Sequence, residues 1–364
     1  MTTAWLLNLL LYQPAAGGFS RYAERVVPHL KGRRLSLVPF VGNNELGCLV
    51  DAPLAVGHAP SRRVMQRLSL AQHGLGLKQI LSRPEFSDLG AVYSPYCDYL
   101  FAASRLPQLI TCHDLTPLFF AGSRRAYLRY RFLTPLHLRR ADQVISISRF
   151  VADQLVEIGL PHSRIKVVPN GVEVERRPVN APQSQDWLVL ARHDRNKNIG
   201  QIIQAFGLFL KRHPHWEGSL VVVGKHGRET KSLFRMVHEL SLEERVDFVK
   251  SLHPEELTKC LRRAFALVSA SFMEGFDYPV LEAKAEGIPT LISSIPVHCE
   301  FHADSSLFFP CGSDPSGLAE AMGELVADKS LWQHLSAEGF SLAKQLSIQQ
   351  QVGSIQRLMS QMLV

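Results

Sequence analysis

The sequence predicts an α/β protein with two domains, each built around a parallel sheet. Its 364 residues exceed the usual size of a single hydrophobic core. Hydrophobic residues make up 46% of the chain and charged residues 20%, a balance typical of soluble globular proteins. Residues 265–294 read as strand, loop, helix and strand, which is the crossover unit of a parallel sheet.

The crossover unit at residues 265–294 has clear internal boundaries. Short apolar runs at residues 264–268 and 288–293 predict buried strands. Pro279 at the start of the intervening segment and Gly287 just after its end predict a short helix. The loop at residues 272–278 is therefore expected at the carboxyl end of a strand, where open α/β sheets bind ligands.

Two carboxylates flank this loop, Glu274 within it and Glu282 in the first turn of the helix. Backbone N–H groups at a helix start attract anions, and carboxylate oxygens accept hydrogen bonds from hydroxyl groups. A diphosphate between two polyhydroxyl groups, as in a nucleotide-sugar, fits this pattern. On spacing alone a simpler alternative stays open, in which Glu282 only favours the helix dipole and Glu274 is a solvated loop residue.

The first domain begins with an apolar run, residues 4–12, that predicts the first strand and is too short to span a bilayer. Gly17 and Gly18 then predict a tight turn into a helix, although such a pair alone is weak support for a ligand site. Further along, a strand ends at His113, which could donate to a sugar hydroxyl or a phosphate. Taken alone, His113 is more often a structural residue.

A segment rich in proline and polar residues, 173–186, predicts the linker between the domains. The next strand ends in a polar loop with Arg192 and Lys197. Two cations at a strand end would complete a clamp on a diphosphate. The alternative is a solvated charged loop, and as loop charges both residues are expected to add little to folding stability.

The six cysteines have no metal-binding spacing and read as reduced thiols of a cytoplasmic protein. No Asp-x-Asp motif occurs, so neither a catalytic divalent metal nor any other cofactor is expected. Signatures of nucleic-acid-binding domains are absent, so no nucleic acid is expected as a partner.

The charge of the chain is unevenly placed. Residues 1–177 hold 22 Lys and Arg against 12 Asp and Glu, a balance of +10, and residues 178–364 hold 18 against 21, a balance of −3. The densest basic region, residues 124–140, interleaves aromatic and leucine residues with arginines and could lie on an anionic membrane. An ordinary surface helix kinked at Pro135 is the alternative. The arginines concerned are Arg124, Arg125, Arg129, Arg131, Arg139 and Arg140.

The segment EGFDYPVLEAKAEGIPTLIS, residues 274–293, resembles the E-x7-E segment of the family 4 glycosyltransferases, a large retaining group with the GT-B architecture. Both glutamates, the Gly-Phe pair, Pro279 and the later Gly-x-Pro match. The sequence departs from the family wording at Asp277, Tyr278 and Lys284.

Other segments extend the resemblance over nearly the whole chain. Residues 191–198 cover the family's G-R-x-x-x-x-K-N motif, with Ala191 in place of glycine. The glycine turn after the first strand, the His-Asp-Leu at residues 113–115 and the Pro-Asn-Gly-Val at residues 169–172 also match. The resemblance raises His113 to a site candidate beside the donor sugar.

The resemblance implies two Rossmann-like domains that face each other across a cleft. The expected divisions are an acceptor-side domain at residues 1–172, the linker at 173–186, a donor-binding domain at 187–346 and a C-terminal helix at 347–364 that crosses back to the first domain.

The resemblance also implies the activity, namely transfer of a hexose from a nucleotide-sugar with retained anomeric configuration. A GDP-mannose-type donor is favoured over a UDP-sugar, and the acceptor is a saccharide or lipid-linked saccharide of bacterial surface polysaccharide synthesis. The implied catalytic residues are Glu274, His113, Arg192 and Lys197. The implied donor-binding residues are Gly17, Gly18, Gly275, Phe276, Asp277, Val280, Leu281 and Glu282.

Two other classes of function stay open. A glycoside hydrolase also uses two carboxylates, but it leaves the glycine turn and the Arg192 and Lys197 pair unexplained. A non-catalytic subunit would bind the nucleotide-sugar and transfer nothing. We expect a cytoplasmic protein, and whether it binds the inner face of the cytoplasmic membrane peripherally is open.

Overall fold

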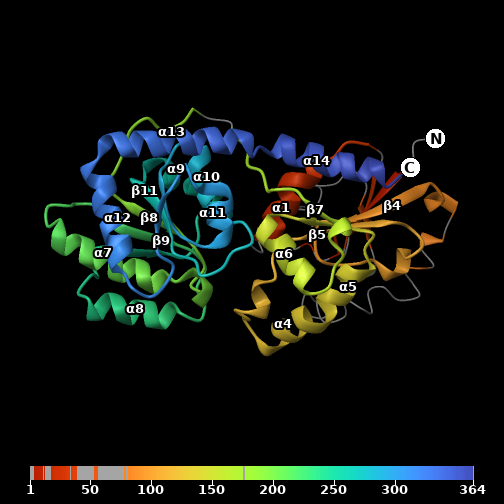
Figure 1. Cartoon of the computed structure of the whole chain (residues 1–364), viewed down its shortest axis with the longest axis horizontal. Coiled ribbons are helices and arrows are strands. Elements are labelled where there is room, and N and C mark those ends of the chain that lie inside the picture. Colours follow the sequence, from red (N-terminus) through yellow and green to blue (C-terminus); the bar gives the residue numbers. More distant parts are fainter. Residues whose placement is uncertain are drawn as a thin grey trace. The chain divides into compact units, whose positions relative to one another are not determined.

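The computed structural model describes residues 4–10, 12, 18–32, 34–38, 53–55, 78, 81–82, 84–174 and 177–363. The chain forms two compact units (Figure 1). The first comprises Met1–Gly171 and Ile348–Val364, and the second comprises Val172–Ser347. Each unit contains a sheet in which the described neighbouring strands pair in parallel. The predicted α/β class with two Rossmann-like domains is therefore confirmed.

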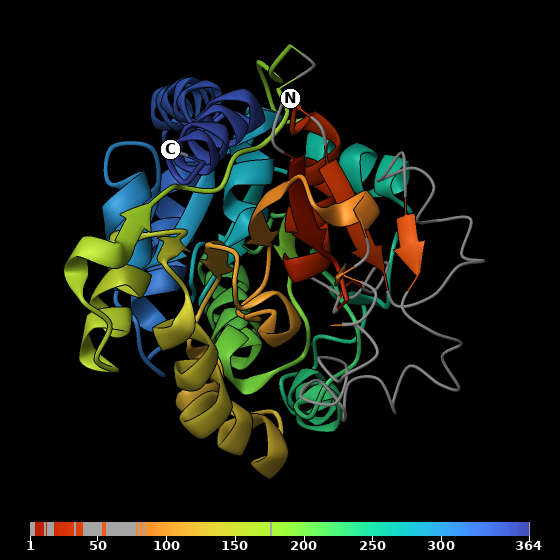
Figure 2. The ribbon, with the colours of Figure 1, turned by 90° about the vertical axis from the view of Figure 1, so that its right-hand side faces the viewer.

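The sheet of the first unit has the order β3-β2-β1-β4-β5-β6-β7 in the described residues. Figure 2 shows its N-terminal strand β1 beside β4. The strands are β1 (Ala4–Asn8), β2 (Arg34–Val38), β3 (Pro53–Ala55), β4 (Leu89–Ser94), β5 (Gln108–Cys112), β6 (Gln143–Ser146) and β7 (Ile165–Val167). The α-helices are α1 (Gly18–Val26), α4 (Arg124–Leu128), α5 (Thr134–Arg140), α6 (Arg149–Glu157) and α14 (Ile348–Gln361).

The last helix, α14, belongs to the first unit although the second unit precedes it in the sequence. Val352, Ile355 and Met359 are buried at helical spacing on α14. The side chain of Gln351 accepts a hydrogen bond from the backbone N–H of Gly171 at 2.8 Å and donates to Asn170 at 3.1 Å. These contacts hold the C-terminal helix to the end of the first unit's main segment.

The second unit has a sheet of order β10-β9-β8-β11-β12-β13 in the described residues. Its strands are β8 (Trp187–Leu190), β9 (Leu220–Val223), β10 (Val246–Val249), β11 (Ala266–Ser269), β12 (Thr290–Ser293) and β13 (Leu307–Phe309). Its α-helices are α7 (Ile199–Arg212), α8 (Thr230–Glu239), α9 (Pro254–Arg263), α10 (Tyr278–Ala285), α11 (Pro296–His302), α12 (Ser316–Ala327) and α13 (Lys329–Gln345).

Two buried clusters lie on the sheet of the second unit. One packs α7, α8, α12 and α13 against it around Trp187, Phe206 and Trp332. The other packs α9 and α10 against it around Val280 and Ile288. This three-layer arrangement buries both faces of the sheet, which explains why its inner strands β8 and β9 are continuous apolar runs rather than alternating ones. The described part of the segment predicted as a linker packs on this unit, since Val179 N–H donates to the Glu286 carbonyl.

The helix α10 begins at Tyr278, one residue before the predicted start at Pro279. Asp277 precedes it in the left-handed backbone region, with φ 67°. At the other end Gly287 has φ 77°, and the N–H groups of Gly287 and Ile288 bond back into the last turn. This is the glycine-terminated helix end that the sequence predicts. A Cβ on Gly287 would also lie 2.6 Å from Pro178 Cβ, so the site excludes a side chain.

A fully buried lysine, Lys284, lies in α10. Its Nζ donates to the carbonyl and hydroxyl oxygens of Ser305, at 2.5 and 2.6 Å. Its stem fills the space beside Gly339 of α13, where a Cβ would lie 2.9 Å from Lys284 Cγ. Burial lowers the pKa of the Lys284 amino group to about 7.

The basic segment at residues 124–140 is not one uniform helix. A π-helical turn, Arg129–Leu133, joins α4 to α5, and Pro135 is the second residue of α5. Because proline lacks an N–H group, a change of hydrogen-bond register at this point is physically reasonable. Within the described ranges, no helix combines the length and the apolar character that a bilayer span needs.

We expect the free energy of unfolding of Lys284→Met, relative to that of the native protein, to rise as the pH falls from about 10 to about 7. The pKa of Lys284 is depressed from 10.5 to about 7 in the folded state, so the unfolded chain binds this proton more tightly. Protonation therefore lowers the native free energy of unfolding by about 1.4 kcal/mol per pH unit in that window, and the loss is complete below it. Urea unfolding across the pH range, with exposed Lys211→Met as control, measures this. A difference that does not vary with pH would contradict it.

Candidate active site

Two loops of the second unit meet at one edge of its sheet. One follows β8 and leads to α7, and the other follows β11 and leads to α10. Because β8 and β11 are parallel neighbours, their carboxyl ends lie at the same edge. The backbone N–H of Phe272 donates to the carbonyl of Asn196 at 2.8 Å, which ties the loops together.

The loops bring together Lys197 and Glu274, which the sequence separates by 77 positions. Lys197 Nζ lies 2.5 Å from Glu274 Oε1, and the side chains are only 21% and 13% exposed. Burial raises the pKa of the Glu274 carboxyl, and the charge of Lys197 opposes this rise. The alternative of two solvated loop charges is therefore wrong for this pair.

Asp277 forms a second buried carboxylate at the same edge. Its side chain is 2% exposed. Asp277 Oδ2 accepts a hydrogen bond from Ser269 at 2.6 Å and lies 3.2 Å from Nε2 of His298 on α11. Burial alone would raise the pKa of Asp277, but the charge of Lys197 and the hydrogen bond from His298 hold it well below its usual range. Asp277 is thus an ionised carboxylate inside the protein.

A small cavity opens between the ends of β8 and β11. The polar side chains that line it are those of Lys197, Ser269, Ser271 and Asp277. Pro279, at the start of α10, lines it as well. The cavity therefore joins the cation of one loop to the helix start of the other, as the sequence predicts for an anion site.

Arg192 is placed differently from Lys197. Its side chain is 63% exposed, and its guanidinium pairs with Asp194 of the same loop at 3.0 Å. The loop itself is held firmly, because the backbone N–H of Glu229 donates to the His193 carbonyl at 3.0 Å. A Cβ on Gly227 would lie 2.3 Å from that same carbonyl oxygen, so this contact depends on a glycine.

The other predicted donor-binding residues of this unit lie in the loop before α10 or in its first turns. Gly275, Phe276, Val280 and Leu281 are buried, and Val280 packs in the core beneath the sheet. The Val280 N–H donates to the Asp277 carbonyl at 3.1 Å. Glu282 is half-buried on α10.

The remaining predicted residues belong to the first unit. His113 is buried at the end of β5, and its Nε2 donates to the carbonyl of Pro95 at 2.7 Å. Burial lowers the pKa of His113 to about 4, so the ring is neutral at pH 7. Gly18 is exposed at the start of α1 and has open space around it. Gly17 lies outside the described residues.

Sequence reasoning missed His298 entirely, and it named Asp277 as a donor-binding candidate without predicting that its carboxylate is buried. The available signal was that the sequence departs from the family wording at Asp277. A carboxylate placed there requires partners, and those partners come from β11 and α11. Nothing in the local sequence around His298 identifies it as one of them.

Two family models match consecutive parts of the chain. The model described as Glycosyltransferase Family 4 matches residues 16–176, and the model described as Glycosyl transferases group 1 matches residues 173–341.

Relatives with curated functions match only part of the chain. The chain is 28% identical over 204 residues to the O-antigen chain mannosyltransferase RfbU of Salmonella typhimurium, covering 55% of this chain and 56% of that protein. It is 26% identical over 216 residues to the GDP-mannose:cellobiosyl-diphosphopolyprenol alpha-mannosyltransferase of Xanthomonas oryzae, covering 58% and 56%. The chain thus spans about half the length of the curated relatives it matches.

Among solved structures, Anabaena HepE in complex with UDP and glucose aligns with a TM-score of 0.78. The alignment covers 99% of this chain and 100% of that chain at 17% identity. A likeness at this identity is a likeness of fold.

The structure changes one expectation, that Lys197 adds little to folding stability. Lys197→Ala leaves the buried Glu274 and Asp277 without their shared cation, so we expect a loss of about 3 kcal/mol in the free energy of unfolding. Arg192→Ala removes an exposed charge, so we expect a change below about 0.5 kcal/mol. Chemical denaturation at neutral pH compares the two variants. Equal losses would show that the Lys197–Glu274 pair is not a buried ion pair in solution.

Proposed function

Because the chain belongs to the family 4 glycosyltransferases and has the two Rossmann-like units of the GT-B fold, we propose that it transfers a hexose from a nucleotide-sugar to a saccharide or lipid-linked saccharide. The two family models support glycosyl transfer. The observation that carries the proposal is that Lys197, which pairs with Glu274, lines one cavity together with Pro279 at the start of α10.

In this reaction the bond between sugar C1 and the diphosphate oxygen breaks. Positive charge grows on the sugar and negative charge on the leaving diphosphate. Lys197, Arg192 and the start of α10 stabilise the leaving group, and a preorganised contact of this kind is worth roughly 3–4 kcal/mol. The acceptor hydroxyl attacks from the leaving-group side and gives its proton to a diphosphate oxygen, so the anomeric configuration is retained.

The two glutamates have different roles in this proposal. Glu274 accepts hydrogen bonds from the sugar hydroxyls once the diphosphate draws Lys197 away from it. Glu282 holds the ribose diol, and His113 supplies a neutral hydrogen-bonding group for the donor sugar. No divalent metal is required, because Lys197 and the helix start compensate the diphosphate charge.

GDP-mannose is the donor we favour. Two relatives support it, RfbU, a mannosyltransferase of O-antigen chains, and the Xanthomonas enzyme, which uses GDP-mannose. A UDP-sugar is the second candidate, which the structure of HepE with UDP and glucose supports. We place the reaction in bacterial surface polysaccharide synthesis on the cytoplasmic side of the membrane.

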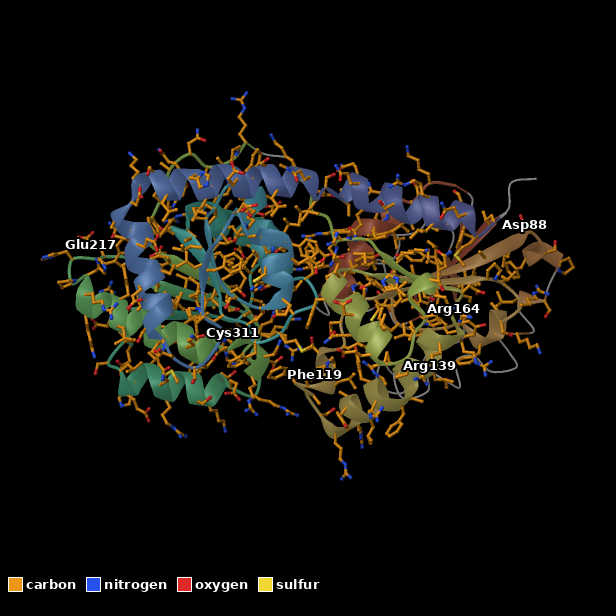
Figure 3. All side chains as sticks on the ribbon, in the orientation of Figure 1. Asp88, Phe119, Arg139, Arg164, Glu217 and Cys311 are labelled. Atoms are coloured by element: carbon orange, nitrogen blue, oxygen red, sulfur yellow. The ribbon has the colours of Figure 1, made fainter. Side chains whose placement is uncertain are left out.

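A surface of the first unit, formed by residues 119–136, supports docking on a membrane that carries a lipid-linked acceptor. Five of the nine exposed large apolar side chains in the described residues lie there, namely Phe119, Tyr127, Leu128, Phe132 and Leu136. Figure 3 labels Phe119, on the stretch that leads into α4. Exposed apolar groups gathered in this way mark interaction surfaces.

The same surface carries four exposed arginines, Arg124, Arg125, Arg129 and Arg131. In the part of the chain that the structure describes, none of them forms an ion pair with an acidic side chain. Arg139 differs, because its guanidinium donates to the carbonyl of Ile158 at the end of α6. Arg139 therefore has a structural role, and the proposed membrane contact rests mainly on the other four.

The donor proposal predicts that the two glutamates fail differently. Glu274→Gln should retain binding of the nucleoside diphosphate but lose transfer by about 10²-fold or more. Glu282→Ala should mainly weaken nucleotide binding, because a ribose contact is shared by ground and transition states. Calorimetry with GDP and UDP, and product analysis with their sugars in excess chelator, measure these effects. Glu239→Ala, an exposed carboxylate on α8, is the control.

Equal loss of nucleotide affinity in both variants would contradict the assigned roles. Hydrolysis of a glycoside without any nucleotide would favour a hydrolase. Transfer only with added divalent metal would contradict the metal-independent site.

The membrane proposal predicts binding to vesicles rich in anionic lipid at low salt. Phe119→Ser with Phe132→Ser, or Arg125, Arg129 and Arg131 all changed to Glu, should abolish it, since each basic residue near such a surface contributes about 1 kcal/mol. Sedimentation with vesicles measures the bound fraction. Phe234→Ser and Arg235→Glu on α8, exposed in the second unit, are matched controls. Binding that ignores salt, or that the controls reduce equally, would exclude this surface.

A further inference from the structure

Two cysteine side chains of the first unit meet at one edge of its sheet. Cys112 is the last residue of β5, and Cys97 belongs to the loop that follows β4. Both are free thiols. Cys97 Sγ donates to the carbonyl of Thr111 at 3.6 Å, and the side chains of Cys97 and Cys112 are hydrogen-bonded to each other. Because β4 and β5 are parallel neighbours, their carboxyl ends lie together, which brings the two thiols into contact.

The two thiols differ in their access to solvent. Cys97 is half-buried, whereas Cys112 is completely buried. The hydrogen bond with Cys97 and burial raise the pKa of the Cys112 thiol, so Cys112 keeps its proton at neutral pH. The thiolate form of a cysteine is the one that attacks a disulfide. A small oxidant therefore meets Cys97 first, and Cys112 reacts second.

The pair is linked to His113 through the backbone. Cys112 directly precedes His113, and the Nε2 of His113 donates to the carbonyl of Pro95, in the same loop as Cys97. The strand β5 pairs with β4 on one side and β6 on the other, so it is held more firmly than the loop. A covalent bond brings two sulfur atoms closer than a hydrogen bond does. Such a bond would therefore move the loop after β4 relative to His113.

We propose that Cys97 and Cys112 are a redox modification site, which a low-molecular-weight disulfide such as oxidised glutathione converts to an intramolecular disulfide beside His113. The Cys97 thiolate attacks the small disulfide, forms a mixed disulfide with it and releases one thiolate. The Cys112 thiolate then attacks the Cys97 sulfur, forms the internal disulfide and releases the second thiolate. The two cysteines lose two electrons to the small disulfide, and their two protons end on the two released thiols.

Mass spectrometry of the full chain, incubated with oxidised glutathione and then alkylated, detects the bond. Arg105 lies between the two cysteines, so trypsin releases them on separate peptides unless a disulfide joins them. The linked peptides should form without denaturant and disappear with dithiothreitol. They should exceed links from either cysteine to any other by about tenfold, because contact makes the reaction intramolecular. Modification of Cys299 and Cys311, exposed in the second unit, shows that the oxidant reached the protein.

The order of the two steps gives a second test. Cys112→Ser should stop at the mixed disulfide of Cys97 with glutathione. Cys97→Ser should leave Cys112 unmodified in the folded chain, because Cys112 is buried. Cys311→Ser, the same change at a cysteine of the second unit, should leave the bond between Cys97 and Cys112 unchanged.

The effect on the reaction rests on the proposed function. In the oxidised protein, transfer should fall by about tenfold or more, because His113 loses its alignment with the donor sugar. Dithiothreitol should restore transfer, and Cys97→Ser should keep its activity in the oxidant. The affinity for GDP and UDP should stay within about twofold, since the groups proposed to hold the diphosphate belong to the second unit.

A folded chain without the linked peptides, in a sample whose Cys299 and Cys311 are modified, would overturn the proposal. A link that forms only in urea would do the same, because thiols in contact need no unfolding. Equal loss of transfer in oxidised Cys97→Ser would overturn the effect on His113. If the reduced protein transfers nothing, the proposed function fails, and mass spectrometry still decides whether the two cysteines are a modification site.

Discussion

The ion pair between Lys197 and Glu274 is the contact on which the candidate site depends. It joins two loops that are distant in sequence and adjacent in space only because β8 and β11 are parallel neighbours. In a largely buried setting an unpaired charge is costly, so each partner requires the other while no ligand is bound. For the same reason Glu274 can be replaced as the partner of Lys197, since an anion that binds Lys197 compensates its charge instead.

In the proposed donor site, stability and function place opposite demands on this edge of the sheet. Folding favours complete neutralisation of Glu274 and Asp277 by groups of the protein, whereas anion binding favours a cation that can also bind the ligand. The unit satisfies both by adding partners behind Asp277, from Ser269 and His298. The rigid ends of α10, a left-handed residue at 277 and a left-handed glycine at 287, keep these groups in place.

The sequence predicted those features that depend on residues close together along the chain. Pro279 and Gly287 defined α10 to within one residue, and apolar runs defined the strands on either side. Side-chain pairs between residues far apart in the sequence were harder to predict. The clamp of Lys197 with the helix start was predicted, but its pairing with Glu274 depends on strand order, which no local pattern gives. His298 was missed because its importance comes only from Asp277, and Lys284 because a buried amine contradicts the usual place of lysine.

The basic segment of the first unit shows why residue type alone cannot assign a role. Arg139 and Arg131 lie in the same run of arginines, yet Arg139 caps the carbonyl end of α6 while Arg131 is exposed beside Phe132. The difference follows from where each faces after the π-helical turn shifts the register of the helix. Counting charges over the run gives the sign of the surface, and only the fold separates the arginine that bonds within the unit from those that stay exposed.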